Sequence, residues 1–151
     1  MRECSRSSWH MFSKYHYLSS QLPGGLNFFF GLYYENQQIG FAALSEYKPW
    51  NGTSVRMLHT NRIVIHPDYC GIGLAKPFIN AIASKYRKRG FRICEKMSSL
   101  SRYKQLRRDS NWRLMRTGYL TPSGTGNMLR DTGFRNKVRY WCFEYLGERN
   151  V

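Results

Sequence analysis

The sequence predicts an α/β fold in a single domain spanning residues 1–151, and three observations support this. Residues 62–90, followed by another strand-like segment, predict a strand–helix–strand crossover. Most of the other segments are short, apolar or aromatic, and separated by Gly, Pro and Asn, which is typical of strands. The 151 residues, 42% of them hydrophobic, are enough for one domain with a core.

The first third of the chain predicts one short helix and three strands. Trp9, Phe12, Tyr15 and His16 have the spacing of a helix face, with Ser7 or Ser8 as the cap. The strands that follow are predicted at 27–35, 39–47 and 54–65.

Residues 62–90 form the most informative stretch. Ile63, Val64 and Ile65 predict a strand buried on both faces. Gly71 and Gly73 permit a sharp turn before a helix that runs to about Gly90. Such a turn aims backbone N–H groups at one point, which favours an anion such as pyrophosphate. From the glycines alone, an ordinary turn without a ligand is equally consistent, because neither G-x-G-x-x-G nor a P-loop is present.

The rest of the chain predicts three strands and one basic helix. The strands are expected at 91–97, 112–120 and 137–146, and the helix at 98–111, capped by Ser98 or Ser99. Residues 121–136 form a long Gly-, Ser- and Thr-rich connection, and long loops in compact domains are usually functional or mobile. The predicted element order is αβββαβαββ.

Tyr69-Cys70-Gly71-Ile72-Gly73-Leu74-Ala75 resembles the acyl-CoA pyrophosphate loop of the GCN5-related N-acetyltransferases (GNAT), whose pattern is Gln/Arg-x-x-Gly-x-Gly/Ala. Cys70 departs from this pattern, since it stands where Gln or Arg is usual. The predicted element order is also similar to that of the family over nearly the whole chain. The resemblance implies a mixed β-sheet of about six to seven strands flanked by about four helices, with acetyl-CoA or another acyl-CoA as cofactor.

The resemblance also implies where the cofactor lies. The pantetheine chain is expected along Ile63, Val64 and Ile65. The thioester is expected to point toward the N-terminal helix, the strand near His59 and the segment that begins at Ser98. The pyrophosphate is expected on the backbone amides of the loop: Cys70, Gly71, Ile72, Gly73, Leu74 and Ala75.

Candidate catalytic residues come from several segments. Many family members place a tyrosine proton donor where this sequence has Arg107, so Tyr103, one turn earlier, is the substitute. The family's usual base is a glutamate on the strand before the loop, where this strand offers His59, either as base or as a structural residue. His16 and Tyr17 form another pair, with His16 as base and Tyr17 as proton donor; alternatively, they only pack the helix against the sheet. Ser98 completes the set.

Residues 14–19 together with the glycine loop are similar to acetyltransferase-like domains from phages and mobile elements. They resemble more loosely the Mom proteins of Mu-like phages, which have the same fold and modify adenine in DNA. A Mom-like function is therefore an alternative.

The charge is strongly basic, with 24 Lys and Arg against 9 Asp and Glu, a net charge of +15. An acyl-CoA needs only a few of these cations, and the surplus favours a nucleic acid as partner over a merely solvated surface. Phosphate contacts are expected from the basic helix and the long loop: Arg102, Lys104, Arg107, Arg108, Arg130 and Arg135.

Several functional classes are disfavoured. No apolar run is long enough to cross a membrane, and residues 1–9 lack the apolar stretch of a signal peptide, so we expect a cytoplasmic protein. Neither the four cysteines nor the four histidines have metal-ligand spacing, so no metal is predicted and the cysteines are expected to be free thiols.

The sequence therefore predicts an acyl-CoA-dependent transferase that acts on a nucleic acid or a nucleic-acid-associated substrate. The alternatives are Mom-like modification of DNA adenine and a non-catalytic nucleic-acid-binding module, which Cys70 and the displaced tyrosine favour. Protein lysines and small amines stay open as acceptors, as do the acyl group and the number of subunits, a homodimer included.

Overall fold

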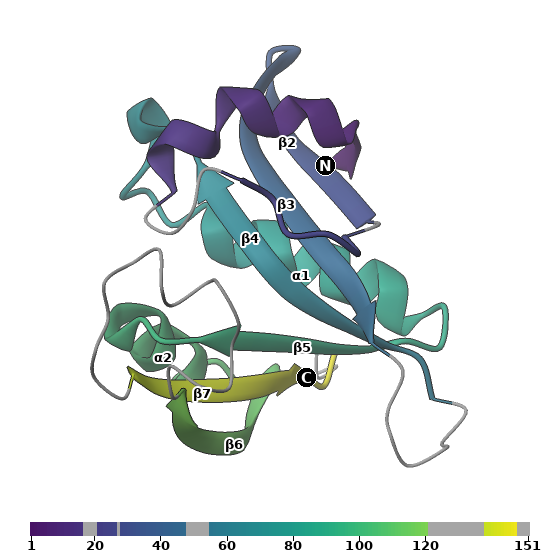
Figure 1. Cartoon of the computed structure of the whole chain (residues 1–151), viewed down its shortest axis with the longest axis vertical. Coiled ribbons are helices and arrows are strands. Elements are labelled where there is room, and N and C mark those ends of the chain that lie inside the picture. Colours follow the sequence, from purple (N-terminus) through teal and green to yellow (C-terminus); the bar gives the residue numbers. More distant parts are fainter. Residues whose placement is uncertain (17–20, 27, 48–54, 121–137, 148–151) are drawn as a thin grey trace. The chain divides into compact units, whose positions relative to one another are not determined.

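The computed structural model describes residues 1–16, 21–26, 28–47, 55–120 and 138–147 (Figure 1). These residues form seven strands, two α-helices and three 3-10 helices, which confirms the predicted α/β class and strand number. Contacts divide the chain into two compact parts, Met1–Ile93 and Cys94–Val151, described in turn below. None of the helices in the described ranges is long and apolar enough to span a bilayer.

The first part is an antiparallel sheet in the order β1-β2-β3-β4. Its strands are β1 (Arg2–Glu3), β2 (Phe28–Tyr34), β3 (Gln37–Tyr47) and β4 (Met57–Ile65). The N-terminal 3-10 helices cover one face and α1 (Ala75–Arg87) covers the other (Figure 1). Successive aromatic residues of β2 therefore pack on opposite faces of the sheet. Phe29 packs near Phe41 on the face covered by the 3-10 helices, whereas Phe30 packs against Tyr86 of α1.

The N-terminal helix differs from the prediction. It consists of two 3-10 helices, η1 (Arg6–Met11) and η2 (Ser13–Tyr15), and its cap is Ser5, whose hydroxyl accepts the Ser7 N–H at 3.2 Å. The i, i+3, i+6 spacing of Trp9, Phe12 and Tyr15 explains this, because residues three apart are eclipsed in a 3-10 helix. Trp9 and Phe12 are buried against Phe41.

β4 contains a bulge just before its last residues. Ala43 of β3 pairs with Arg62, and the next residue, Leu44, pairs with Thr60, so Asn61 is the extra residue. Arg62 is buried and donates from Nη1 to the carbonyl and side-chain oxygens of Asn61, at 3.1 and 2.8 Å. Of the three apolar residues that follow Arg62, only Val64 is buried; Ile63 and Ile65 are half-buried, so the prediction of burial on both faces is wrong for them.

α1 follows the predicted pattern closely. Phe78, Ile82 and Tyr86 are buried at four-residue spacing, and Pro77 lies in the first turn, where its lack of an N–H has no cost. The chain leaves the helix through Gly90 at φ +84°. The Arg92 N–H then donates to the Arg56 carbonyl at 2.9 Å, so β5 (Arg92–Met97) begins beside the start of β4.

The second part contains the rest of β5 together with α2 (Leu100–Arg107), β6 (Trp112–Leu120) and β7 (Val138–Tyr145). Its strands run antiparallel in the order β5-β7-β6. Of the two candidate caps, Ser99 is the one used: its hydroxyl accepts the Arg102 N–H at 3.3 Å. α2 ends four residues earlier than predicted, because Asp109 accepts the Asn111 N–H at 3.0 Å and stabilises a turn there.

Candidate functional site

A glycine loop, residues 70–74, connects η3 (Pro67–Tyr69) to the start of α1. Gly71 and Gly73 both have φ +84°, a conformation that residues with a Cβ rarely adopt. A Cβ built on either glycine would meet no atom within 4 Å. The backbone conformation, not crowding, is therefore what requires glycine at these two positions, and the space beside them is open.

The loop presents a series of backbone amides. The Cys70 N–H donates to the Pro67 carbonyl at 3.0 Å, and the next backbone bond runs from the Phe78 N–H to the Leu74 carbonyl at 3.1 Å. Within the described residues, the N–H groups from Gly71 to Ala75 have no backbone acceptor. They lie at the positive end of the α1 dipole, an arrangement suited to an anion.

Cys70, the departure from the family pattern, makes a side-chain hydrogen bond that stabilises the loop. Its thiol donates to the carbonyl oxygen of Ile65, the last residue of β4, at 3.4 Å. The side chain therefore ties the start of the loop to the end of the strand. The contact gives the Cys70 side chain a structural role, and its backbone N–H is engaged by the Pro67 carbonyl, so the amides that lack a backbone acceptor begin at Gly71.

His66 lies between β4 and the loop, and no function was predicted for it. Its Nε2 lies 3.4 Å from the Tyr15 hydroxyl, with the two rings edge to face at 5.1 Å. Its Nδ1 accepts the Asp68 N–H at 3.4 Å and lies 3.6 Å from the Asp68 carboxylate. His66 therefore joins η2 to the base of the loop. The His-Pro-Asp sequence just before the loop was the available signal.

His16 is half-buried, edge to face with Trp9 at 5.8 Å. Burial is the main cause that lowers the pKa of His16, and the nearby Arg62 guanidinium acts in the same direction; together they bring it from 6.5 to about 4. The imidazole is therefore neutral at pH 7, yet a weak base, because an efficient general base has a pKa near the working pH. This favours a hydrogen-bonding role for His16. Tyr17 lies outside the described residues.

The other candidate catalytic residues are held by packing contacts. His59 on β4 is half-buried and contacts the Tyr47 ring edge to face at 5.5 Å. In the second part, Tyr103 stacks on Trp141 with ring centroids 4.6 Å apart, and half-buried Ser98 precedes the cap of α2. The catalytic roles of these three residues stay predictions.

The predicted phosphate-binding residues separate into two groups. Arg102 is withdrawn into the fold by a bidentate ion pair with Glu95, at 2.6 and 2.7 Å, so its assignment to a nucleic-acid surface is wrong. Lys104, Arg107 and Arg108 are exposed, as predicted for such a surface. Arg130 and Arg135 lie outside the described residues.

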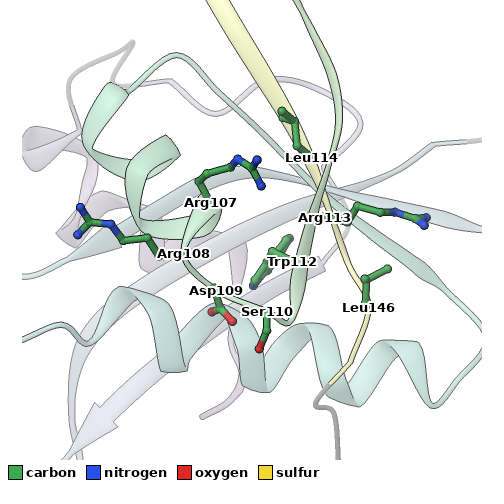
Figure 2. Close-up of a pocket in the computed structure, with 8 residues that line it drawn as sticks. All are labelled: Arg107, Arg108, Asp109, Ser110, Trp112, Arg113, Leu114 and Leu146. Atoms are coloured by element: carbon green, nitrogen blue, oxygen red, sulfur yellow. The ribbon is translucent and has the colours of Figure 1, made fainter.

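Arg107 and Arg108, at the C-terminal end of α2, border an open pocket of about 540 Å³ (Figure 2). Figure 2 shows the Arg108 side chain pointing to the left, away from the side chains of Arg107 and Arg113, which both extend to the right in this view. Arg113 also donates to Glu144 at 3.1 Å. Cations that diverge in this way do not converge on one phosphate; they suit an extended polyanion. The lining residues are Arg107, Arg108, Asp109, Ser110, Trp112, Arg113, Leu114 and Leu146.

Comparison with solved structures finds the same fold. The chain is similar to the ribosomal-protein-S18-alanine N-acetyltransferase of Escherichia coli (TM-score 0.63, 12% identity, 99% of this chain and 96% of that one). It is also similar to NAA60 of Arabidopsis thaliana, solved with acetyl-CoA (TM-score 0.64, 11% identity, 95% and 96%). A third similar structure is a GNAT family acetyltransferase of Elizabethkingia anophelis with acetyl-CoA bound. Its TM-score is 0.56 at 11% identity, and the match covers 93% of this chain and 82% of that one.

Comparison with curated proteins finds no match. The sequence model of the acetyltransferase (GNAT) family, however, matches residues 1–104, which include the glycine loop and more than half of the chain. The GNAT resemblance and the fold class predicted from the sequence are confirmed. The chain therefore belongs to the acetyltransferase (GNAT) family, whose members take the acyl group from an acyl-CoA.

Proposed function

We propose that this chain binds acetyl-CoA, or another acyl-CoA, on the glycine loop and transfers the acyl group to an amine of a nucleic acid or of a nucleic-acid-associated protein. The observation that carries the proposal is the loop itself: two glycines at φ +84° and a run of amides without backbone acceptors among the described residues, at the start of α1.

The loop fits the pyrophosphate of an acyl-CoA. The amides of Gly71, Ile72, Gly73, Leu74 and Ala75 are the groups that would hold it, assisted by the α1 dipole. The open space beside both glycines leaves room for an approaching phosphate. Ile63 and Ile65, half-buried on β4, are the residues proposed for the pantetheine chain. The cofactor supplies the activated acyl thioester.

The chain's own catalytic groups have to remove a proton from the acceptor amine and stabilise charge on the thioester oxygen. His59 is proposed as the base, because the low pKa of His16 leaves that residue a weak proton acceptor. His16 is proposed to accept a hydrogen bond near η1 and not to act as the base. Tyr103 stays the proposed proton donor.

The acceptor class rests on charge. Lys104, Arg107 and Arg108 are exposed, and no ion pair is recorded for any of them within the described part of the chain. Such a surface supports an acceptor that is a polyanion or is bound to one. Two structural neighbours, from E. coli and Brucella melitensis, are ribosomal-protein-alanine N-acetyltransferases, which supports including proteins of nucleic-acid complexes among the acceptors. Mom-like DNA modification stays a sequence-based prediction that none of these neighbours supports.

The first test is acetyl-CoA binding by calorimetry to the wild-type chain and to the double variant Gly71→Asp/Gly73→Asp. Gly90→Asp is the matched control, because Gly90 has the same φ of +84° and equally open surroundings at the other end of α1. Binding by the wild type and the control, lost in the double variant, is the expected result. Equal binding by all three proteins would refute the loop assignment.

The acceptor is tested by mass spectrometry of DNA and tRNA nucleosides, and of ribosomal proteins, from cells that express the wild type or the double variant. An acyl adduct that depends on Gly71 and Gly73 in any of these pools supports the proposal, and its mass separates acetylation from Mom-type chemistry. Cofactor binding without an adduct in these pools would redirect the search to small amines. Absence of both cofactor binding and adducts would leave the non-catalytic binding module.

A further inference from the structure

The central strand of the second part carries a cysteine between two cations. Cys142 on β7 pairs in register with Lys96 on β5 and with Arg116 on β6. Residues directly opposite each other in an antiparallel sheet project from the same face, with their Cβ atoms about 4.5–5.5 Å apart. The sulfur of Cys142 is therefore flanked by a basic side chain on each neighbouring strand.

A second thiol lies on the same face. Cys94 pairs in register with Glu144, two residues from the Lys96–Cys142 pair, so it is the diagonal neighbour of Cys142. Its side chain makes a hydrogen bond with that of Cys142. None of the four cysteines, all of which lie in the described ranges, forms a disulfide. Cys142 thus has a thiol donor in addition to its two flanking cations.

Other charged or titratable groups of this face are Glu144, Arg113 and Tyr140. Arg113 neutralises part of the Glu144 charge, with Nη2 and Oε2 3.1 Å apart. The Lys96 ammonium lies 4.3 Å from the centre of the Tyr140 ring, which keeps this cation on the same face. Cations that face Cys142 therefore outnumber carboxylates among the described neighbours on the three strands.

Exposure differs between the two thiols. Cys94 is buried, whereas Cys142 is half-buried and its partners Lys96 and Arg116 are exposed. A small reagent can reach a sulfur in such a position. Partially exposed, electropositive surroundings distinguish reactive cysteines from the buried, inert ones.

The acid–base behaviour of the pair agrees with this geometry. The pKa of Cys142 is lowered from 9.0 to about 7, mainly by the hydrogen bond with Cys94 and in addition by Lys96 and Arg116. Burial and the Glu144 carboxylate oppose the change. Near pH 7, a large fraction of Cys142 is therefore thiolate, the nucleophilic form.

We propose that Cys142 is a nucleophilic modification site for small soft electrophiles, peroxides in particular, and that Cys94 stabilises its thiolate by hydrogen bonding. With hydrogen peroxide, the thiolate forms an S–O bond as the O–O bond breaks. The sulfur is oxidised to sulfenic acid, the peroxide is reduced, and hydroxide leaves. A disulfide with Cys94 is not proposed, because diagonal neighbours have Cα atoms about 7–8 Å apart, beyond the usual disulfide range. The proposal is independent of the acyltransfer function.

The experiment measures alkylation of the full-length, folded chain by iodoacetamide between about pH 5.5 and 9.5, followed residue by residue with peptide mass spectrometry. The expected half-maximal rate for Cys142 lies near pH 7. In urea, where the strands separate, the midpoint should rise toward 9.0, the ordinary value of the thiol pKa. A folded profile that coincides with the unfolded one would overturn the proposal. Labelling of Cys142 only after the chain has unfolded would also overturn the proposal.

Variants separate the causes. Cys94→Ala should raise the midpoint for Cys142 by about one pH unit, whereas Cys94→Ser should restore it, because a hydroxyl still donates a hydrogen bond. If Cys94→Ala does not fold, Lys96→Gln/Arg116→Gln tests the cations instead and should also raise the midpoint. Cys4→Ala is the control and should leave it unchanged. Peroxide followed by dimedone should label Cys142 in the wild type; an adduct on the other cysteines only contradicts the proposal.

Discussion

Arg102 of α2 binds Glu95 of β5 through two hydrogen bonds of 2.6 and 2.7 Å, with its side chain 13% exposed and that of Glu95 5% exposed. The guanidinium also donates to the Gln105 side chain. This cation is part of the interior of the second part, although its position on a basic helix made it a candidate for binding phosphate. A buried, bidentate pair is sensitive to the loss of one partner, since the remaining charge has no compensation.

Replacing Arg102 by alanine should lower the free energy of unfolding by about 3–5 kcal/mol, because the Glu95 carboxylate is left buried without its cation. Lys104→Ala, on the same helix but exposed, is the control and should change stability by no more than about 0.5 kcal/mol. Urea denaturation measures both. The double variant Glu95→Leu/Arg102→Leu should recover most of the loss; equal losses from Arg102→Ala and Lys104→Ala would contradict the role of the pair.

The second prediction compares two glycines that flank α1 and share φ +84° and open surroundings, Gly73 before the helix and Gly90 after it. Alanine at either position should cost about 1–2 kcal/mol of stability, since the left-handed conformation is unfavourable for a residue with a Cβ. Only Gly73→Ala should weaken acetyl-CoA binding, because relaxation of its backbone redirects the loop amides. Thermal unfolding and calorimetry measure the two effects. A similar loss of affinity in Gly90→Ala would mean that binding responds to stability in general.

The third prediction concerns pH. The pKa of His16 is about 4 in the folded chain and 6.5 when unperturbed, so the unfolded chain binds more protons between these values. The stability contributed by neutral His16 is therefore complete above about pH 6.5 and decreases as the pH falls toward 4. Because the residue is only half-buried, solvent screening reduces the effect to about 1–2 kcal/mol.

His16→Gln should flatten this part of the stability profile, measured by urea denaturation at several pH values. The exposed His10, replaced by glutamine in the same way, is the control and should keep the slope of the wild type. NMR titration of the His16 ring should show a midpoint near pH 4. A midpoint near 6.5 would show instead that the ring is solvated, and would restore His16 as a candidate base.

Local pattern was enough to predict most of the fold. β6 was predicted at its observed bounds, and α1 was found because its four-residue spacing, Pro77 and Gly90 all indicate the same helix. The 3-10 helices were missed because Trp9, Phe12 and Tyr15 satisfy both helical periods. The bulge at Asn61 was also missed, since it depends on which residue of β3 lies opposite, and spacing within one strand does not contain that information.

The part of the candidate site that consists of backbone groups was predictable from the sequence. The part that depends on contacts between side chains of distant segments was less predictable. Gly71 and Gly73 identified the loop because glycine is the residue type that adopts a positive φ readily, as both do here. The contact between Tyr15 and His66 joins residues 51 positions apart, and the low pKa of His16 arises from burial and from Arg62. These are consequences of tertiary packing. Similarly, no local signal separates Arg102, which is paired, from Arg107 and Arg108, which are exposed.

The last prediction tests the basic pocket as a polyanion surface. Arg107→Gln/Arg108→Gln should weaken binding to nucleic acid about equally across sequences. For double-stranded DNA, the slope of log affinity against log salt should become shallower by about 2, since each phosphate contact contributes about 0.9. The control, Lys88→Gln/Arg89→Gln, removes the same charge from exposed positions just after α1. Fluorescence anisotropy at several salt concentrations gives both slopes. An equal change in the two variants would mean that net charge alone drives binding; a change confined to Arg107 and Arg108 would place the polyanion at the pocket in Figure 2.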